Sequence, residues 1–445
     1  MIQKAFIISL LLTALSFNAD CQHFNKSRLD SLLDLLAEKK EAMGSLVISK
    51  NKQVIYSRAI GYSVISEEKK KPASLNTKYR IGQATQMFTA AMIFQLIEAG
   101  HITLSTTLDT FWPQIPDAKE ITIYNLLSHS SGLHNFANDP DYQTWSTHAK
   151  TEKELIRIIA KDTLDFPPNC NVAYSDANYL LLGYILQKVC KKPYAELLEH
   201  LITSKAGVKN TFAGGRINIA NEESVSYKYS NDWKETPQTD MTVAGGAGCI
   251  VSTPFDLVKL IEALFSSKLC SRSSLEQMKT ADNDFKVGMG LHPVELYSRP
   301  GYGCHESIDG FSILLFYFPD DSLAIAYCSN AERYLRAGIF YGIVSACFDK
   351  NYSFPVFDES TAKSKELDDY LGTYIMENGQ KFEITKDQAT LIAYIGGMSA
   401  HIPLEAAGKD KFKFEFIGLE FEFDPNDGVL IMQLDGHTYR LLKQK

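Results

Sequence analysis

The chain has 445 residues, of which 45% are hydrophobic and 22% are charged. It is too long for a small disulfide-stapled scaffold and too apolar for a disordered chain, so we expect one large folded domain and a smaller one. The formal net charge of −8 excludes a broad surface for nucleic acid or anionic lipid. A small-molecule or peptide ligand, or a protein partner, remains compatible with this charge.

The first residues have the pattern of a signal peptide. A short basic start at residues 1–4 precedes an apolar run over residues 5–17, which is too short to span a bilayer. Asp20 directly before Cys21 argues against a lipid-modified cysteine. We therefore expect residues 1–21 to be removed, no membrane span to remain after cleavage, and the mature protein to be secreted or periplasmic.

The eight cysteines form no recognisable ligand or redox pattern. No C-x-x-C occurs, and the gaps fit no zinc site. In an oxidising compartment this spacing predicts mostly buried thiols, with at most one disulfide.

Hydrophobic periodicity predicts a mixed helix and sheet domain over residues 22–348. Leucines at helical spacing predict a helix over residues 26–40, and two short apolar runs, 45–49 and 54–59, predict an antiparallel hairpin. Further predicted elements are helices over 87–99 and 177–189, a hairpin over 312–328 and a helix over 335–348. Hairpins at both ends with helices between them predict the α+β class, with an antiparallel sheet.

A polar stretch over residues 349–364 predicts a linker. Beyond it, residues 365–445 contain phenylalanines that alternate with charged residues, which is typical of half-buried strands. This segment holds nine basic and fourteen acidic residues. We expect a small, acidic, all-β, barrel-like domain whose role is packing or contact with a protein partner.

Five segments, in order and at similar spacing, resemble the serine β-lactamase and penicillin-binding protein superfamily in its class C-like branch. They are Tyr79-Arg80-Ile81-Gly82 with Phe88-Thr89-Ala90-Ala91; Leu126-Leu127-Ser128-His129-Ser130-Ser131-Gly132-Leu133; Tyr174-Ser175-Asp176 with its following helix; Ala244-Gly245-Gly246-Ala247-Gly248; and Asp309-Gly310-Phe311-Ser312. The resemblance implies an antiparallel sheet flanked by helices, a helical subdomain, and an active site between them.

The resemblance places the nucleophilic serine of the superfamily at Gln83 and its lysine, three residues later, at Gln86. A carboxamide is neither a nucleophile nor a base near neutral pH, so no acyl-enzyme is expected here. Thr85 lies two residues after Gln83, so on a helix its side chain points to a different side from that of Gln83. We expect its hydroxyl to form a local hydrogen bond.

The second motif of the superfamily, Tyr-x-Asn, is Tyr174-Ser175-Asp176 in this chain. Tyr174, the implied proton carrier, is retained, whereas Asp176 replaces an asparagine and, when ionised, only accepts hydrogen bonds. Asp176 fits either a binding role or a structural role at the start of the helix that follows.

The third motif, Lys-Thr-Gly or His-x-Gly, falls just before Asp309. One frame places Cys304 at the histidine and Glu306 at the glycine, and a frame shifted by one residue uses His305. Either frame loses part of the motif, because a glycine lets substrate approach the strand. Cys304 and His305 are adjacent on a strand and point to opposite faces, so we do not expect them to act as a nucleophile and base.

The resemblance and these replacements together predict an exported β-lactamase-related pseudoenzyme. It would bind a small molecule or peptide in an inherited pocket at Gln83, Gln86, Tyr174, Asp176, Cys304 and His305, with no cofactor and no metal. The alternative is an active hydrolase of the β-lactamase, D-alanyl peptidase or esterase type that uses a non-standard site around Tyr174. Another alternative is an interaction protein that acts through its C-terminal domain.

Overall fold

The computed structural model describes residues 24–66, 70–230, 232–279, 288–334, 336–352, 354, 366–387, 390–395, 401–414, 418–434 and 436–444. The expected signal peptide and most of the expected linker lie outside these residues. The chain divides into two compact units, one over residues 33–336 and one that joins the N-terminal residues through 32 to residues 337–445. Within the described ranges, no helix has both the length and the apolarity to cross a membrane.

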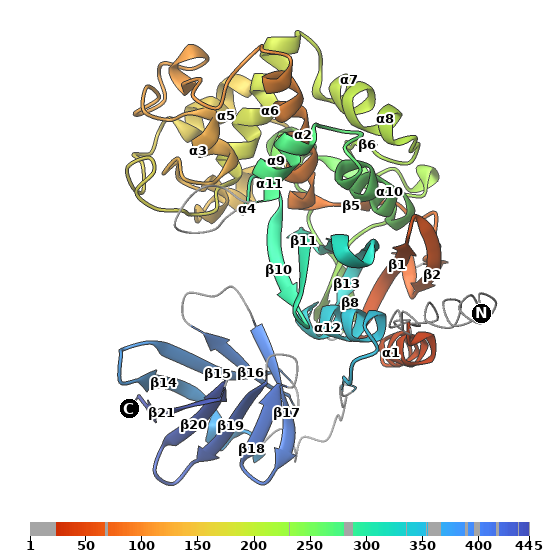
Figure 1. The fold of residues 1–445 in the computed structure, drawn as a ribbon, viewed down its shortest axis with the longest axis vertical. Helices are drawn as coiled ribbons and strands as arrows, with labels where there is room; N and C mark the ends of the chain where they lie inside the picture. Colours follow the sequence, from red (N-terminus) through yellow and green to blue (C-terminus); the bar gives the residue numbers. More distant parts are fainter. Residues whose placement is uncertain are drawn as a thin grey trace, which may run out of the picture. The chain divides into compact units, whose positions relative to one another are not determined.

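A six-stranded antiparallel sheet forms the base of the larger unit (Figure 1). Both predicted hairpins are confirmed as adjacent strand pairs, the first and second strands near the N-terminus and the two strands joined at Pro319–Asp321. In spatial order the strands are β10 (His292–Leu296), β11 (Arg299–Ile308), β12 (Phe311–Phe318), β13 (Leu323–Glu332), β1 (Ala42–Lys50) and β2 (Gln53–Ile60).

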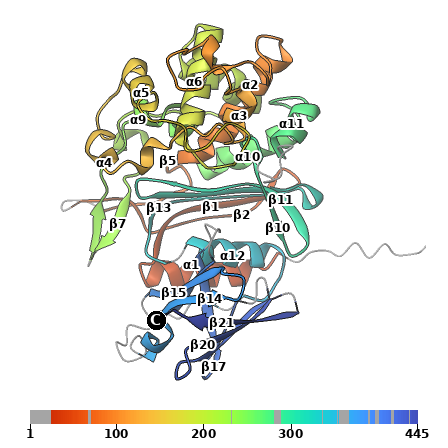
Figure 2. The same ribbon diagram turned by 90° about the vertical axis from the view of Figure 1, so that its left-hand side faces the viewer.

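Helices of this unit gather on one face of the sheet, as Figure 2 shows. Among them, α10 packs directly on β1, β12 and β13. The helices of this layer are α2 (Thr85–Glu98), α3 (Ile123–Leu127), α4 (Tyr142–Trp145), α5 (Glu152–Ile159), α6 (Asp176–Cys190), α7 (Tyr194–Leu198), α8 (Ser204–Ala206), α9 (Met241–Gly248), α10 (Pro254–Phe265) and α11 (Arg272–Lys279). Two further helices are not part of it: α1 (Lys26–Glu38) crosses the boundary between the two units, and α12 (Arg336–Cys347) belongs, apart from Arg336, to the other unit.

The centre of the helical layer is made by α2, α6 and α9. Helices α2 and α6 are buried over most of their length, which is expected of helices that are apolar on nearly every side. Gly183 and Gly246 let α6 and α9 approach closely, because a Cβ added to Gly183 would lie 2.9 Å from the Gly246 Cα. Gly245, with φ +43°, interrupts α9 one residue earlier.

Three small sheets complete the larger unit. They are β3 (Tyr62–Ile65) with β4 (Lys70–Pro72); β5 (Tyr79–Arg80), β9 (Ile250–Ser252) and β6 (Phe212–Ala213); and β7 (Tyr227–Ser230) with β8 (Asp232–Glu235).

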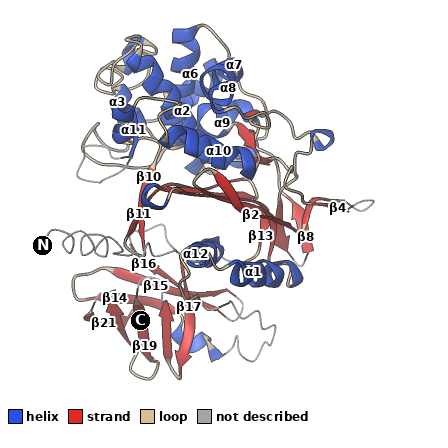
Figure 3. Ribbon diagram, turned by 45° about the vertical axis from the view of Figure 1, so that its right-hand side comes forward, coloured by secondary structure: helices blue, strands red, loops and turns tan. Residues whose placement is uncertain are grey.

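The C-terminal strands form a closed eight-stranded barrel, whose strands are red in Figure 3. The alternation seen in the sequence is confirmed, because Phe412, Phe414, Phe421 and Phe423 are buried inside it. The strands are β14 (Gly372–Met376), β15 (Lys381–Asp387), β16 (Thr390–Ile395), β17 (His401–Gly408), β18 (Lys411–Phe414), β19 (Leu419–Asp424), β20 (Val429–Leu434) and β21 (His437–Lys443).

The seven cysteines in the described ranges are all free thiols, and five of them are buried. The expected buried thiols are therefore found, and no disulfide joins any two of these seven.

Candidate functional site

The chain enters α2 through a short 3-10 turn that carries the first candidate residue. This turn, η1 (Gly82–Ala84), continues directly as α2 from Thr85, so Gln83 and Gln86 are three residues apart on one side of it. Gly82 has φ +51°, and a Cβ there would lie 3.1 Å from the Ile308 Cβ. The end of β11 therefore packs against the turn that carries Gln83.

The hydroxyl of Thr85 has a structural role, but its partner is distant in sequence and not local as expected. The residue is fully buried, and its Oγ1 accepts a hydrogen bond of 3.2 Å from the Ile250 N–H. Gln83 differs, because its Oε1 is buried without a hydrogen-bond partner in the described chain.

His129 is the innermost member of a hydrogen-bonded chain of side chains. The backbone of His129 has a φ of +54°. The ring centroids of Tyr174 and Tyr179 lie 4.8 Å and 5.2 Å from that of its imidazole, and these contacts fix the orientation of the ring. Its Nδ1 accepts from the Ser175 N–H at 3.3 Å and from Asn178 Nδ2 at 3.1 Å. Nδ1 therefore carries the lone pair, and the ring proton belongs on Nε2.

From His129 Nε2, a series of hydrogen bonds runs in one direction and ends at the Asp176 carboxylate. His129 Nε2 donates to Gln86 Oε1 at 3.3 Å, and Gln86 Nε2 donates to the Tyr174 hydroxyl at 2.7 Å. Tyr174 in turn donates to Asp176 Oδ1 at 2.6 Å. Gln86 thus occupies the position of the superfamily's lysine as a neutral link with both ends of its carboxamide engaged.

The protonation states of these groups follow from their surroundings. Burial lowers the pKa of His129 to about 3, so the ring is neutral at physiological pH. Burial and the charges of Asp176 and Glu306 raise the pKa of Tyr174 well above its usual value, although 39% of the residue is exposed. Burial raises the pKa of Asp176 to about 6, and the bond from Tyr174 partly offsets that rise.

Glu306 supplies a second carboxyl group to this site. Burial and the charge of Asp176 raise the pKa of Glu306 to about 7, and Arg336 partly offsets the rise. Its Oε1 lies 4.0 Å from Nε2 of His292, a ring whose pKa burial lowers. The predicted anion at the superfamily's glycine position is therefore present, and it feels the charge of Asp176.

Cys304 and His305 lie on opposite faces of β11, as the alternation of a strand requires. Cys304 pairs with Leu315, and both belong to the core beneath the helices. His305 pairs with Leu314, outside that core, and feels the charge of Arg336. His305 therefore lies on the face opposite Cys304 and Glu306, and its place among the binding residues stays a prediction.

The side chain of Cys304 is buried, and its pKa is raised well above the usual value by burial and by the charge of Glu306. A thiol held protonated in this way does not act as a nucleophile. Ser175 is also buried, and its hydroxyl donates to the His134 carbonyl at 3.1 Å. Both side chains are therefore held in the interior of the fold.

Asp176 begins α6, and its side chain is engaged by a neighbour in the site. Its side chain accepts from Tyr174, and its own N–H donates to Asn135 Oδ1 at 3.2 Å. It therefore belongs to the group around Tyr174. No set of three or more His, Cys, Asp or Glu side chains in the described ranges is arranged to hold a metal ion.

Two members of the site, His129 and Glu306, were not among the predicted site residues. Glu306 carries a signal in the sequence, because it is two residues from Cys304 and so shares its face of the strand. His129 carries only a weak signal, since its partner Gln86 is 43 residues away and the loop motif does not show where the ring points.

Comparisons with known proteins identify the family. The β-lactamase family model matches residues 30–340. A penicillin-binding protein of Bacillus subtilis (strain 168) is 24% identical over 94% of this chain and 99% of its own length. A teichoic acid D-alanine hydrolase of Staphylococcus aureus is 26% identical over 51% of this chain and 55% of its own length.

Solved structures show the same fold. The octameric penicillin-binding protein homologue from Pyrococcus abyssi has a TM-score of 0.67 and 22% identity, and the match covers 94% of this chain and 99% of that one. The D-amino acid amidase from Ochrobactrum anthropi SV3 has a TM-score of 0.63 and 22% identity, and the match covers 72% of this chain and 97% of that one. The sequence motifs, the fold and these matches together show that the chain belongs to the β-lactamase family of serine hydrolases and penicillin-binding proteins.

Proposed function

We propose that this protein binds a ligand at the family's active-site position and does not transfer an acyl group there. The observation that carries the proposal is Gln86, whose carboxamide is held by His129 on one side and by Tyr174 on the other. An acyl-enzyme requires a hydroxyl nucleophile and a base beside it, and Gln83 and Gln86 supply neither.

Tyr174 does not compensate for this loss. A base or nucleophile at neutral pH needs a lowered pKa, whereas burial and two neighbouring carboxyl groups hold the pKa of Tyr174 well above its usual value. Its proton is already engaged in the bond to Asp176.

The charge of the site favours a cationic ligand. Relative to the family motifs, a lysine is replaced by neutral Gln86, an asparagine by Asp176 and a glycine by Glu306. The raised pKa values of Asp176 and Glu306 mean that these carboxylates lack sufficient compensating positive charge, and a bound ammonium group would supply it.

The activities stated in the names of two relatives indicate which class of cationic ligand to test. One is a teichoic acid D-alanine hydrolase and another a D-amino acid amidase. D-Alanyl esters and D-amino acid amides both carry a free amino group beside a carbonyl. We therefore expect this protein to bind such amides or esters through their ammonium group.

Calorimetry with D-phenylalaninamide tests this function, with N-acetyl-D-phenylalaninamide as the uncharged control. We expect the ammonium form to bind, the acetylated form to bind at least about tenfold more weakly, and no D-phenylalanine to form during long incubation. Asp176→Asn and Glu306→Gln should each weaken binding, whereas Glu276→Gln, an exposed carboxylate on α11, should not. Equal binding of the two amides would contradict the ligand class.

A second candidate function rests on the same two carboxyl groups. Their pKa values of about 6 and about 7 favour one protonated and one ionised group near neutral pH, which is the arrangement of a general acid and base that act on water. Release of D-phenylalanine that is lost in both Asp176→Asn and Glu306→Gln would support this hydrolase and overturn the binding function.

The proposal includes export. The basic start and apolar run at residues 1–17 support it, as does the relation to penicillin-binding proteins. Fusion of residues 1–25 to alkaline phosphatase, which is active only outside the cytoplasm, should give activity. Loss of that activity is expected when Leu11 and Leu12 are replaced by arginine.

A further inference from the structure

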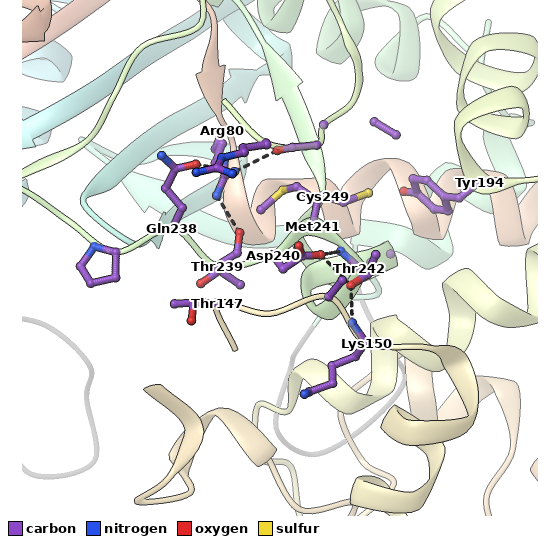
Figure 4. Close-up of a pocket in the computed structure, with 18 of the residues that line it drawn as sticks. Arg80, Thr147, Lys150, Tyr194, Gln238, Thr239, Asp240, Met241, Thr242 and Cys249 are labelled. Carbon is purple, nitrogen blue, oxygen red and sulfur yellow. Dashed lines mark hydrogen bonds between the residues drawn. The ribbon is translucent and has the colours of Figure 1, made fainter. Parts of the chain in front are cut away.

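A cavity of about 1050 Å³ lies beside α9, and it is lined by none of the residues of the site described above. Its walls come from the start of α5, the middle of α6, the glycines after β6 and the segment between β8 and α9 (Figure 4). Ligand cavities typically measure about 300–1,000 Å³, so this one has room for an organic molecule.

Two cations in its lining have no ion-pair partner. Lys150 and Arg216 line the cavity, and neither forms an ion pair with any described residue. Of the lining acids, Glu152 pairs with Lys188 at 2.8 Å, and Asp240 accepts from the Thr242 N–H at 2.9 Å and hydroxyl at 2.6 Å.

Arg80 adds a buried donor to the cavity wall, as Figure 4 shows. The residue is only 3% exposed, and its guanidinium donates to the Thr239 carbonyl at 2.8 Å and the Gly215 carbonyl at 2.9 Å. It also pairs with Asp309 at 3.1 Å. Its Nε–H has no acceptor in the described chain. The bonds to Thr239, Gly215 and Asp309 hold the guanidinium in place as a fixed part of the cavity wall.

The rest of the lining is largely apolar or neutral. Tyr184, Tyr194 and Met241 contribute to it, and the Tyr194 hydroxyl is already bonded to Thr89 at 2.7 Å. Cys249 also lines the cavity, and burial raises the pKa of its thiol to about 12, so it adds no negative charge. Glu235 is the one lining acid whose side chain has no hydrogen bond or ion pair among the described residues.

We propose that this cavity is a second ligand site, separate from the family's active-site position, that binds a small organic carboxylate with an apolar body. The carboxylate lies toward Lys150 and Arg216, and the body lies against Tyr184, Tyr194 and Met241. The site is independent of the function proposed above, because the two share no residue and prefer ligands of opposite charge.

Gly215 provides a specific way to block the cavity. A Cβ added there meets no atom within 4 Å, and the residue is not in the left-handed region. A phenylalanine at this position therefore fits the backbone, and because Gly215 lines the cavity, we expect the ring to narrow it. The Gly215 carbonyl that Arg80 uses is unaffected.

The test is ligand-observed NMR on the full chain with matched phenylalkyl probes. The probes are 3-phenylpropionate and 4-phenylbutyrate, each with its neutral amide and its amine. We expect the carboxylates to bind and the amides and amines to bind about tenfold more weakly or not at all. Lys150→Gln with Arg216→Gln should weaken carboxylate binding by a similar factor, and Gly215→Phe should abolish it.

Lys153→Gln is the control, because Lys153 is an exposed lysine on α5, next to the lining residue Glu152, and does not itself line this cavity. Unchanged thermal unfolding of Gly215→Phe shows that the blocked variant is folded. The proposal is overturned if no carboxylate binds in preference to its amide, or if binding survives Gly215→Phe. Displacement of the carboxylates by D-phenylalaninamide would equally overturn the separation of the two sites.

Discussion

Tyr174 donates its hydroxyl proton to Asp176 across 2.6 Å while it accepts a bond from Gln86 at 2.7 Å. The hydroxyl cannot reverse the first bond, because ionised Asp176 only accepts. The tyrosine that resembles the family's proton carrier is therefore fixed as a donor at the end of a chain that starts at neutral His129.

Tyr174→Phe tests this relationship directly. The bond from Tyr174 holds the pKa of Asp176 lower than burial alone would, so its removal should raise that pKa above about 6. Carbon-13 NMR of the labelled carboxyl group over a pH series measures the shift. Glu98 is an internal control. It lies at the far end of α2, and its pKa is lowered by hydrogen bonds from Ser274 and Ser271, which the substitution leaves in place. An unchanged or lower Asp176 value would show that the bond is not formed in solution.

Glu306→Gln should change how stability depends on pH. The folded state raises the pKa of Glu306 from 4.5 to about 7, so it binds a proton that the unfolded state releases between these values. Glu306 therefore lowers stability progressively as pH rises from about 4.5 to 7, and Gln removes this loss. The Glu306 side chain is 23% exposed, which reduces the effect. Between pH 5 and pH 8, the free energy of unfolding of Glu306→Gln should rise relative to that of wild type by about 1–2 kcal/mol.

Denaturant unfolding followed by tryptophan fluorescence is the measurement. Trp112, Trp145 and Trp233 are the three tryptophans of the chain, and all lie in the unit over residues 33–336. The charged and titratable groups that interact with Glu306 are Asp176, Tyr174, Arg336, His292 and Cys304. Glu276→Gln, at an exposed site on α11, should show no pH-dependent difference; the same flat result for Glu306→Gln would refute the raised pKa.

Asp309→Ala should be strongly destabilising, because Asp309 is the carboxylate that neutralises buried Arg80. It accepts from Arg80 at 3.1 Å and from the Thr239 hydroxyl at 2.7 Å, and its side chain is 6% exposed. Loss of one partner from a buried ion pair costs about 3–5 kcal/mol. Asp320→Ala, an exposed acid on the next turn, should cost less than about 0.5 kcal/mol in the same tryptophan assay. Equal costs would show that Arg80 does not depend on Asp309.

Local patterns in the sequence predicted the elements but not the contacts between distant segments. The hairpin over β1 and β2, the helix that ends before Gly100 and the alternating phenylalanines of the barrel each follow from residues close in sequence. The contact between Arg80 and Asp309 joins positions 229 residues apart, and nothing in either segment indicates it.

The same contrast between local patterns and long-range contacts applies to the candidate site. The family motifs located Gln83, Gln86, Tyr174 and Asp176, and strand alternation correctly separated Cys304 from His305. The direction of the hydrogen-bonded chain was not predictable, because it depends on the left-handed backbone of His129 and on two donors that fix the position of its ring proton.

Restoration of the nucleophile alone should not restore catalysis. Gln83→Ser with Gln86→Lys returns the hydroxyl and the amine, but the new lysine would lie beside Tyr174 and near the Asp176 carboxylate. Asp176 would hold it protonated, and a protonated lysine does not activate the serine. Glu306 would also repel the carboxylate of a penicillin. We expect no acylation by a fluorescent penicillin in this double variant, as judged by gel fluorescence and intact-protein mass. Addition of Asp176→Asn and Glu306→Gly should allow a detectable acyl-enzyme. Acylation of the double variant itself would show that the two carboxylates do not block the chemistry, and failure of the folded quadruple variant would place the defect elsewhere in the site.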